Sequence, residues 1–109
     1  MTFSIVIPVY CNEPTLEALV DRLEALRPEL PGELEAVFVV DGSPDQSHEF
    51  LQKRLARSPL VAQLLEHSRN FGAFVAIRTG LAHARGDYVG VMAADLQEPP
   101  ELMIAFFDA

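Results

Sequence analysis

Acidic and amide side chains follow three apolar segments of this sequence, at the points where the segments end. In chain order these side chains are Glu13, Asp41, Asp95 and Gln97. Carboxylate and amide oxygens are the ligands that Mg²⁺ and Mn²⁺ prefer in proteins. A carboxylate can also accept a hydrogen bond from a ribose hydroxyl or from the imino group of a base. Carboxylates that converge need a cation to offset their repulsion, so the pattern favours a site for a metal ion and a phosphorylated ligand.

Each of these residues also has an explanation that needs no ligand. Glu13 fits the first turn of a helix, where a negative charge complements the helix dipole. Asp41, with the Gly42-Ser43 that follows it, fits a capping turn. Asp95 and its neighbours fit a solvated acidic loop. The case for a site therefore depends on whether the fold brings these chain positions together.

Apolar periodicity predicts the elements that would position them. Short, continuous apolar runs predict strands at residues 3–9, 36–40, 60–65 and 88–92. Helical spacing predicts helices at residues 14–26, from Ser43 to about 57, at 71–84, and from Pro99 onwards. We expect Asn12 or Glu13 to cap the first helix. Ser43 is the expected N-cap of the second helix, and Gly86 the left-handed residue of the turn after the third.

The alternation of strands and helices predicts an α/β fold, a mainly parallel sheet flanked by helices. Parallel strands end at a common edge, and ligands of such sheets bind outside that edge. Three candidate segments at the edge, besides Asp95, are therefore residues 10–13, 41–43 and 68–72.

Composition excludes several functions. The chain has 109 residues, with 16 Asp and Glu against 8 Lys and Arg, giving a net charge of −8. The basic residues are scattered, so nucleic-acid binding is not expected, and an anionic membrane surface should repel the chain. A single cysteine, Cys11, excludes an internal disulfide. The three histidines lack metal-ligand spacing, and phosphate-binding glycine motifs are missing, which argues against P-loop and dinucleotide-binding domains.

Five blocks of sequence carry a resemblance to a known family. In chain order they are VIPVY at 6–10, FVVDGSPD at 38–45, SRNFG at 68–72, ARGD at 84–87 and ADLQEPP at 94–100. In this order they resemble the family 2 (GT-A fold) glycosyltransferases, and among these the polyprenyl-phosphate glycosyltransferases, which include the dolichyl-phosphate mannose synthase-like enzymes. The blocks extend over nearly the whole chain, and it is the ordered set that makes the resemblance specific.

The resemblance implies an inverting transfer of a sugar from a UDP- or GDP-linked donor. It implies a Rossmann-like, nucleotide-sugar-binding half of a GT-A domain. The implied nucleoside-binding residues are Pro8, Tyr10, Glu13 and Asp41. Asp95 and Gln97 are implied to hold Mg²⁺ or Mn²⁺ on the diphosphate, where the metal would stabilise the departing nucleoside diphosphate.

Two departures from the family pattern bear on this function. The first Asp of the family's Asp-x-Asp motif falls on Ala93, which removes one metal-binding carboxylate. Cys11-Asn12 stands where the family commonly has Asn-Glu, and Cys11 is expected to be an unreactive loop residue because no His or Lys adjoins it. The alternative to a transferase is therefore a module that binds a nucleotide sugar without transferring it.

The resemblance places further parts of the enzyme downstream of this sequence. We expect residues 1–109 to be a single N-terminal, donor-nucleotide-binding part of a longer domain, with the catalytic base beyond Ala109. Downstream segments would bind a polyprenyl phosphate acceptor. The resemblance therefore implies that the full-length enzyme acts at the cytoplasmic face of a membrane. Phe106 and Phe107 lack an obvious partner in four strands, so we expect self-association into a homo-oligomer. A receiver-like domain is a third interpretation, but it would need an Asp where His67-Ser68-Arg69 follows the third strand.

Overall fold

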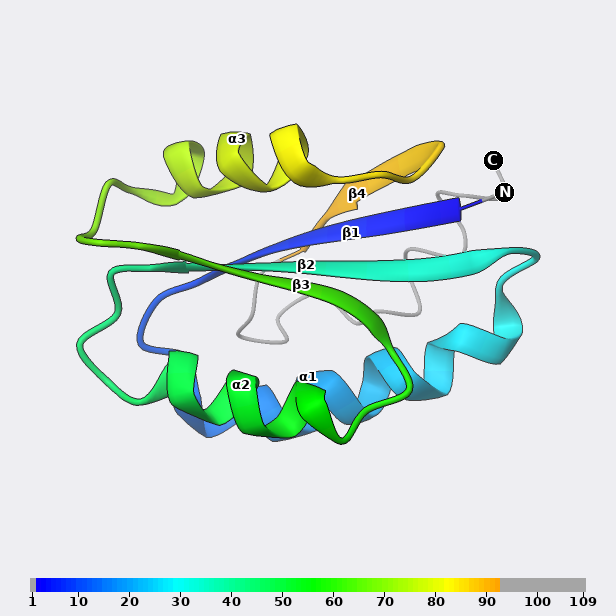
Figure 1. Cartoon of the computed structure of the whole chain (residues 1–109), viewed down its shortest axis with the longest axis horizontal. Coiled ribbons are helices and arrows are strands. Elements are labelled where there is room, and N and C mark those ends of the chain that lie inside the picture. Colours follow the sequence, from blue (N-terminus) through cyan, green and yellow to red (C-terminus); the bar gives the residue numbers. More distant parts are fainter. Residues whose placement is uncertain (1, 93–109) are drawn as a thin grey trace.

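Four parallel strands with helices on both faces make up the computed structural model, which describes residues 2–92 (Figure 1). The strands are β1 (Thr2–Val9), β2 (Glu33–Asp41), β3 (Val61–His67) and β4 (Tyr88–Val91). The helices are α1 (Glu13–Leu26), the short 3₁₀ helix η1 (Arg27–Glu29), α2 (Ser47–Ala56) and α3 (Ala73–His83). The predicted α/β class and the predicted parallel sheet are confirmed.

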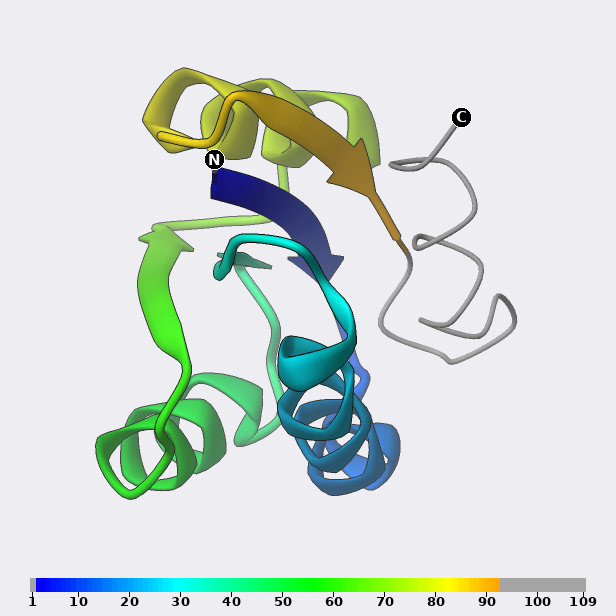
Figure 2. The ribbon, with the colours of Figure 1, turned by 90° about the vertical axis from the view of Figure 1, so that its right-hand side faces the viewer.

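The strand order β3-β2-β1-β4 creates a switch point beside β1. The chain moves outward from β1 to β2 and β3, and then crosses back to pair β4 with the other side of β1. Helices α1 and α2 lie on one face of the sheet and α3 lies on the other (Figures 1 and 2). In open α/β sheets a ligand crevice forms at such a switch point, at the carboxyl ends of the strands.

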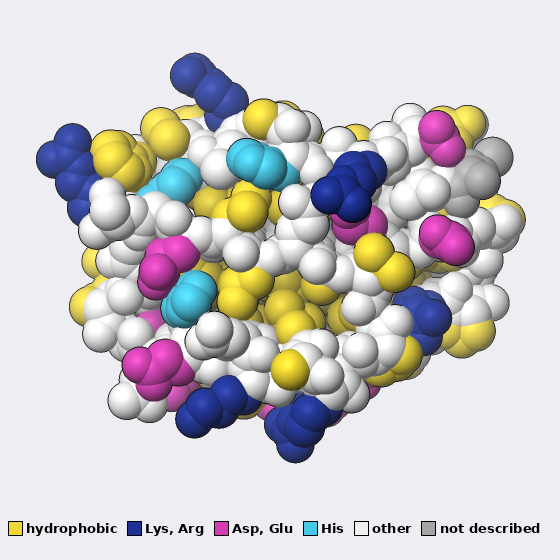
Figure 3. Space-filling view, in the orientation of Figure 1, with side chains coloured by type: hydrophobic (Ala, Val, Ile, Leu, Met, Phe, Trp, Pro, Cys, Tyr) yellow, Lys and Arg dark blue, Asp and Glu magenta, His cyan; other side chains and the backbone are white. Residues whose placement is uncertain are grey.

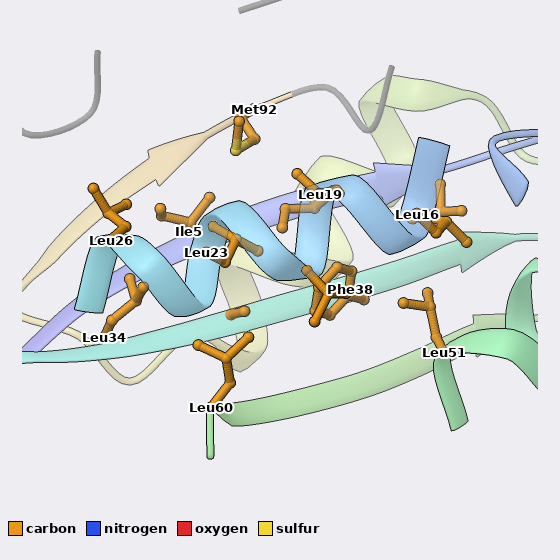
Figure 4. Packing of buried hydrophobic residues seen from close by; sticks show 14 of the residues in the cluster. Ile5, Leu16, Leu19, Leu23, Leu26, Leu34, Phe38, Leu51, Leu60 and Met92 are labelled. Atoms are coloured by element: carbon orange, nitrogen blue, oxygen red, sulfur yellow. The ribbon is translucent and has the colours of Figure 1, made fainter. Parts of the chain in front are cut away.

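The two faces of the sheet bury very different amounts of apolar surface. Alternate residues of β1 and β2, such as Ile5 and Phe38, point into a large core with α1 and α2 (Figure 4). The opposite face holds only a small cluster of Val6, Val37, Val39 and Ala76 beneath α3. Because each large apolar side chain contributes about 2 kcal/mol when fully buried, α1 and α2 hold the sheet more strongly than α3 does.

Helix α3 compensates for its small core by approaching the sheet closely. Gly80 faces β1, and a Cβ atom at this position would lie 2.3 Å from Cγ1 of Val6. A side chain larger than hydrogen would therefore push the helix away from the strand. Gly80 lets the helix backbone pack directly on Val6.

A cluster of charges joins α1 to α2 on the other face. The guanidinium of Arg54 on α2 lies 2.9 Å from Asp21 and 2.8 Å from Glu24, both on α1. Hydrogen bonds to these two residues raise the pKa of Arg54 even though burial opposes that shift. The two helices whose amino ends adjoin the carboxyl edge of the sheet are thereby fixed relative to each other.

The predicted start of α2 was wrong. The helix begins at Ser47 with Gln46 as its N-cap, three residues later than the predicted N-cap Ser43. Ser43 caps no helix, because its hydroxyl donates to Asp45 and accepts the N–H of Cys11. A side chain held by these other partners cannot also satisfy the first turn of a helix.

The predicted role of Gly86 was also wrong. The residues with positive φ among those described are Gly42, Gly72 and Cys11, and Gly86 is not one of them. Gly86 is small for a different reason: a Cβ atom there would lie 2.6 Å from Oγ and 2.7 Å from the backbone nitrogen of Ser4. The turn after α3 therefore presses directly on β1.

Two further expectations fall outside the described residues. They are the last predicted helix, from Pro99, and the partners of Phe106 and Phe107. Within residues 2–92, none of the helices has both the length and the apolar character that a membrane span requires.

Candidate functional site

The carboxyl edge of the sheet brings together residues that are far apart in the sequence. Pro8 lies next to the end of β1, opposite Val39 of β2, and Tyr10 and Glu13 follow β1 directly. Asp41 is the last residue of β2. All four predicted nucleoside-binding residues therefore lie at one edge. Asp95 and Gln97, the predicted metal ligands, lie outside the described residues.

The loops after β1 and β2 are tied by reciprocal hydrogen bonds between the amino ends of α1 and α2. The Glu13 carboxylate accepts the N–H of Gln46, at 3.4 Å, in front of α2. The Asp45 carboxylate accepts the N–H of Glu13, at 3.3 Å, at the start of α1, and also the N–H of Ser47 at 3.1 Å. Each helix start thus receives a negative charge from the other loop, which is favourable at a helix N-terminus.

Asp45 is held in its charged form at this junction. Burial raises its pKa, but hydrogen bonds from Ser43, Ser47 and Glu13 outweigh burial and leave the pKa below its ordinary value. The expected side-chain cap from Asn12 does not form, because its Oδ1 accepts the N–H of Tyr10 at 2.8 Å instead. The two loops consequently form one cross-linked unit.

Tyr10 and Cys11 form the exposed tip of the loop after β1. The Tyr10 side chain is 47% exposed. Cys11 adopts a φ of 54°, a left-handed conformation that is uncommon outside glycine. Its N–H donates to Ser43 Oγ at 2.9 Å, which holds this conformation in place. The backbone turn leaves the aromatic ring of Tyr10 available at the edge of the sheet.

Asp41 is the most buried of the four predicted nucleoside-binding residues, with 3% exposure. Its Oδ1 accepts the N–H of Phe71 at 3.0 Å and lies 2.8 Å from Nδ1 of His67, and its Oδ2 accepts the N–H of Gly72 at 2.9 Å. Burial raises the pKa of Asp41, but these bonds outweigh burial and lower the pKa below its ordinary value. The ionised carboxylate fixes the entry to α3.

His67 and Thr79 are site neighbours that sequence reasoning missed. Nδ1 of His67 faces Asp41, and Nε2 lies 2.9 Å from Oγ1 of Thr79 on α3. The spacing of His67 from the other two histidines is not that of metal ligands, so the sequence pattern does not select it. The signal that could have found it is its position, since it ends β3 and pairs in register with Asp41 at the end of β2.

Glycines let the segment after β3 pass across the end of β2. Gly42 has a φ of +62°, and a Cβ atom there would lie 2.2 Å from the carbonyl carbon of Arg69. Gly72 has a φ of +100° and serves as the N-cap of α3. The backbone of residues 69–70 therefore lies directly on Gly42, and the carboxyl ends of β2 and β3 form a continuous wall.

The described residues contain no group of three or more His, Cys, Asp or Glu side chains arranged to hold a metal ion. Glu13 and Asp41 already accept hydrogen bonds from the protein, and Glu13 turns toward α2 rather than toward Asp41. Two hollows of about 470 and 400 Å³ lie elsewhere, one by Arg27 and Gly32 and one between α2 and β3.

Comparisons with known proteins agree on one family. Residues 4–109 match the family model described as Glycosyl transferase family 2. An undecaprenyl-phosphate 4-deoxy-4-formamido-L-arabinose transferase from Pseudomonas fluorescens is 48% identical over 100 residues, which cover 90% of this chain and 29% of the relative. The uncharacterized glycosyltransferase YkcC of Bacillus subtilis is 38% identical over 106 residues, covering 97% of this chain and 32% of the relative.

Solved structures of similar fold include two complexes with nucleotide sugars. The mannosyltransferase PcManGT from Pyrobaculum calidifontis, in complex with GDP-Man and Mn²⁺, has a TM-score of 0.82 and 25% identity, with 95% of this chain and 31% of that chain covered. S. aureus TarS 1-349, in complex with UDP-GlcNAc, has a TM-score of 0.78 and 27% identity, and the match covers 99% of this chain and 31% of that chain.

The chain spans about a third of the length of these relatives. The resemblance inferred from the five sequence blocks is confirmed, and a receiver-like domain is excluded. This chain belongs to glycosyltransferase family 2 and has the α/β fold of its GT-A enzymes.

Proposed function

We propose that this chain is the donor-binding part, residues 1–109, of an inverting glycosyltransferase that uses a UDP- or GDP-linked sugar. The observation that carries the proposal is the carboxyl edge of the sheet, where the four predicted nucleoside-binding residues lie together. Similar structures hold UDP-GlcNAc or GDP-Man, which supports a nucleotide sugar as the ligand. In an inverting transfer, an acceptor oxygen attacks the anomeric carbon while the bond to the diphosphate breaks on the opposite side.

Tyr10, Pro8 and Glu13 would bind the nucleoside from the side of β1. The exposed ring of Tyr10 offers an apolar face against which a base can stack. Pro8 presents a rigid, partly buried surface beside it. Glu13 is exposed and could accept hydrogen bonds from ribose hydroxyls while retaining its bond to Gln46.

Asp41 would recognise the base from the side of β2. A carboxylate has about four acceptor positions, and three of those on Asp41 are used by His67, Phe71 and Gly72. The remaining position is on Oδ2. An imino N–H of uracil or guanine could use it, so this residue fits either donor class.

Asp95 and Gln97, which follow β4 in the sequence, would hold Mg²⁺ or Mn²⁺. Their oxygens are hard donors that suit these ions. The donor diphosphate would complete the ligand set, to which Ala93 supplies no carboxylate. When bound, the metal would supply positive charge to the departing nucleoside diphosphate.

The acceptor class is proposed to be a polyprenyl phosphate. A relative that is 48% identical is named for transfer involving undecaprenyl phosphate. The lipid-docking segments and the catalytic base would lie beyond Ala109, and the enzyme would work at the cytoplasmic face of a membrane. The homo-oligomer expected from Phe106 and Phe107 likewise stays a prediction, which light scattering at increasing concentration would test.

Calorimetric titration with UDP and with GDP, each with and without Mn²⁺, tests the donor site. We expect saturable, metal-dependent binding of one nucleotide. Asp95→Asn should weaken binding in Mn²⁺ by at least tenfold, since it removes the remaining motif carboxylate. Glu33→Gln is the matched control, because Glu33 lies at the amino end of β2 and should leave affinity unchanged. Equal affinity of the Asp95→Asn variant and the parent protein in Mn²⁺ would contradict the metal role.

Ala93 favours a second candidate function, a nucleotide-sugar-binding module without transferase activity. The two functions differ in turnover rather than in binding. If the protein that contains this chain binds the nucleotide sugar but neither transfers nor hydrolyses it, and Ala93→Asp restores turnover, the module is the correct interpretation. Transfer by the unmodified protein would exclude it.

A further inference from the structure

The outer surface of α3 differs in charge from the rest of the chain. Residues 68–86 contain three arginines, Arg69, Arg78 and Arg85, and no Asp or Glu, whereas the whole chain has a net charge of −8. The acidic groups beneath α3, Glu35 and Asp41, are 3% exposed and turn their oxygens toward hydrogen-bond donors of the protein. The exposed part of this layer is therefore basic.

The same surface carries exposed apolar side chains. They are Phe71, Phe74, Val75 and Leu81, with exposures of 44%, 89%, 37% and 47%. Within α3, positions 74, 78 and 81 follow one another at spacings of four and three, which places them on one face of the helix, while Phe71 precedes the helix and Arg85 follows it. Ala76 and Gly80, on the opposite face, pack against the sheet.

Phe74 is the most exposed large apolar residue in the described part of the chain. Nearby, the guanidinium of Arg69 lies 4.8 Å from the centre of the Phe71 ring. In Figure 3, Lys and Arg side chains project beside hydrophobic ones at the upper left, over α3, with no Asp or Glu among them. Exposed apolar side chains beside arginines suit contact with anionic lipid, because the apolar groups can enter the head-group boundary while the arginines attract the anionic head groups.

We propose that the outer face of α3, defined by Phe74, Val75, Arg78 and Leu81 together with Phe71 just before the helix, contacts an anionic lipid surface. The choice of a lipid over another acidic partner rests on the proposed function, in which the acceptor is a lipid phosphate. The arginines pair with lipid head groups, and Phe74 enters the boundary between head groups and acyl chains. Contact here orients the sheet on the membrane.

The net charge of −8 does not prevent this contact. Glu17, Asp21 and Glu24 belong to α1, which lies across the sheet from α3 (Figure 2). At physiological ionic strength, exposed charges are screened beyond about 8 Å, which is less than the thickness of the sheet and one helix layer. The repulsion expected from composition treats the charge as evenly distributed, whereas in the described residues these three α1 carboxylates lie on the face of the sheet opposite α3.

Co-sedimentation with vesicles tests the proposal. Vesicles of phosphatidylcholine alone are compared with vesicles of equal parts phosphatidylcholine and phosphatidylglycerol, at low and at physiological salt. We expect binding to the anionic vesicles that weakens with salt. Phe74→Ser should reduce it about tenfold, and Arg78→Gln about fivefold. Neither variant should change the melting temperature, because both side chains are exposed.

Matched variants on other surfaces serve as controls. Val61→Ser removes a 55% exposed apolar side chain from the start of β3, and Lys53→Gln removes an exposed positive charge from α2. Both should leave vesicle binding unchanged. The proposal is overturned if anionic vesicles are not bound, if neutral vesicles are bound equally, or if the controls lose as much binding as the α3 variants.

Other partners of the α3 face would also overturn the proposal. Retention of a single-stranded oligonucleotide, lost in Arg78→Gln and without vesicle binding, would identify a nucleic-acid surface. Dimerisation that Phe74→Ser abolishes, without vesicle binding, would identify a contact between copies of this chain. Titration with UDP and GDP on the same variants reports on the donor site separately, so failure at α3 is distinguishable from failure of the proposed function.

Discussion

Two buried carboxylates lie at opposite ends of β2, and each fastens one end of α3 to the sheet. Asp41, at the carboxyl end, accepts the N–H groups of Phe71 and Gly72 before the helix. Glu35, at the amino end, accepts the N–H of Arg85 after the helix at 2.9 Å. Burial raises the pKa of each, but their hydrogen bonds outweigh it, and both pKa values lie below the ordinary range.

The two anchors differ in their remaining partners. Glu35 also accepts bonds from the Ser4 hydroxyl at 2.8 Å and the Gln63 amide at 2.9 Å, groups that do not titrate. Asp41 has the ionisable ring of His67, and it stands at the edge where ligands of parallel sheets bind. Both carboxylates hold α3 against the sheet. Glu35 does so at the amino edge, away from the candidate site, whereas Asp41 does so at the edge where the candidate donor site lies.

The largest expected effects on the free energy of unfolding come from replacing the glycines that lie near Asp41 and Glu35. Gly42→Ala should cost about 3 kcal/mol in the free energy of unfolding, because it combines a φ of +62° with a Cβ atom 2.2 Å from the backbone of Arg69. Gly86→Ala, at the Glu35 end, should cost about 2 kcal/mol through its contact with Ser4. Urea unfolding followed by circular dichroism measures both.

Gly72→Ala is the control for backbone strain. A Cβ atom there would meet nothing within 4 Å, but its φ of +100° and ψ of 158° lie in a region that essentially only glycine adopts, so backbone strain alone should cost about 2 kcal/mol. If Gly86→Ala proves more destabilising than Gly42→Ala, the contact between the turn after α3 and Ser4 of β1 is tighter than the crossing at Gly42, and the expected order of the two costs is reversed.

Substituting the carboxylates by amides separates packing from the candidate site. Asp41→Asn turns an NH₂ group toward the fixed N–H of Gly72 and should cost about 2 kcal/mol. Glu35→Gln should also cost about 2 kcal/mol, because the Gln63 amide can rotate to accept a bond only by giving up its own bond to the carbonyl oxygen of His83. Only Asp41→Asn should also weaken nucleotide binding in calorimetry. An equal loss of affinity in both variants would show that α3 docking, rather than Asp41 itself, supports the site.

The pH dependence of stability should show the smallest effect. A carboxylate with a lowered pKa stabilises the fold above its unfolded-state pKa, and that stability is lost as pH falls through the folded-state value. For Glu35 the ordinary value is 4.5. Melting temperature should therefore fall as pH decreases below about 4.5, and the deficit of Glu35→Gln relative to the parent protein should shrink over the same range. A deficit that stays constant with pH would mean that the Glu35 charge contributes nothing.

Local patterns in the sequence were sufficient to predict much of the fold. Continuous apolar runs predicted all four strands, and helical spacing predicted α1 and α3 to within about two residues. These signals are reliable because burying one apolar face is the main contribution to each element's stability. The parallel order of the strands is sufficient to place Tyr10, Glu13 and Asp41 at the same edge of the sheet.

The errors arose where partners distant in the sequence decided the outcome. Ser43 has the sequence of a helix cap, but its bond to Cys11, 32 residues away, removes it from that role. Glycine is needed at position 86 because this residue lies against Ser4, which is 82 residues away in the sequence and accepts its N–H. Contacts of this kind cannot be predicted from the residues that neighbour each position in the sequence.

The amino-acid sequence by itself determined the family, the α/β class and the positions of the candidate donor-binding residues, because motifs and periodicity are local properties. Only the tertiary structure decided that Asp41 is buried against His67, that Glu35 is its counterpart, and that the arginines and exposed aromatics of α3 share one face. Strand register and helix docking set those arrangements. Both depend on packing between segments that the sequence separates by tens of residues.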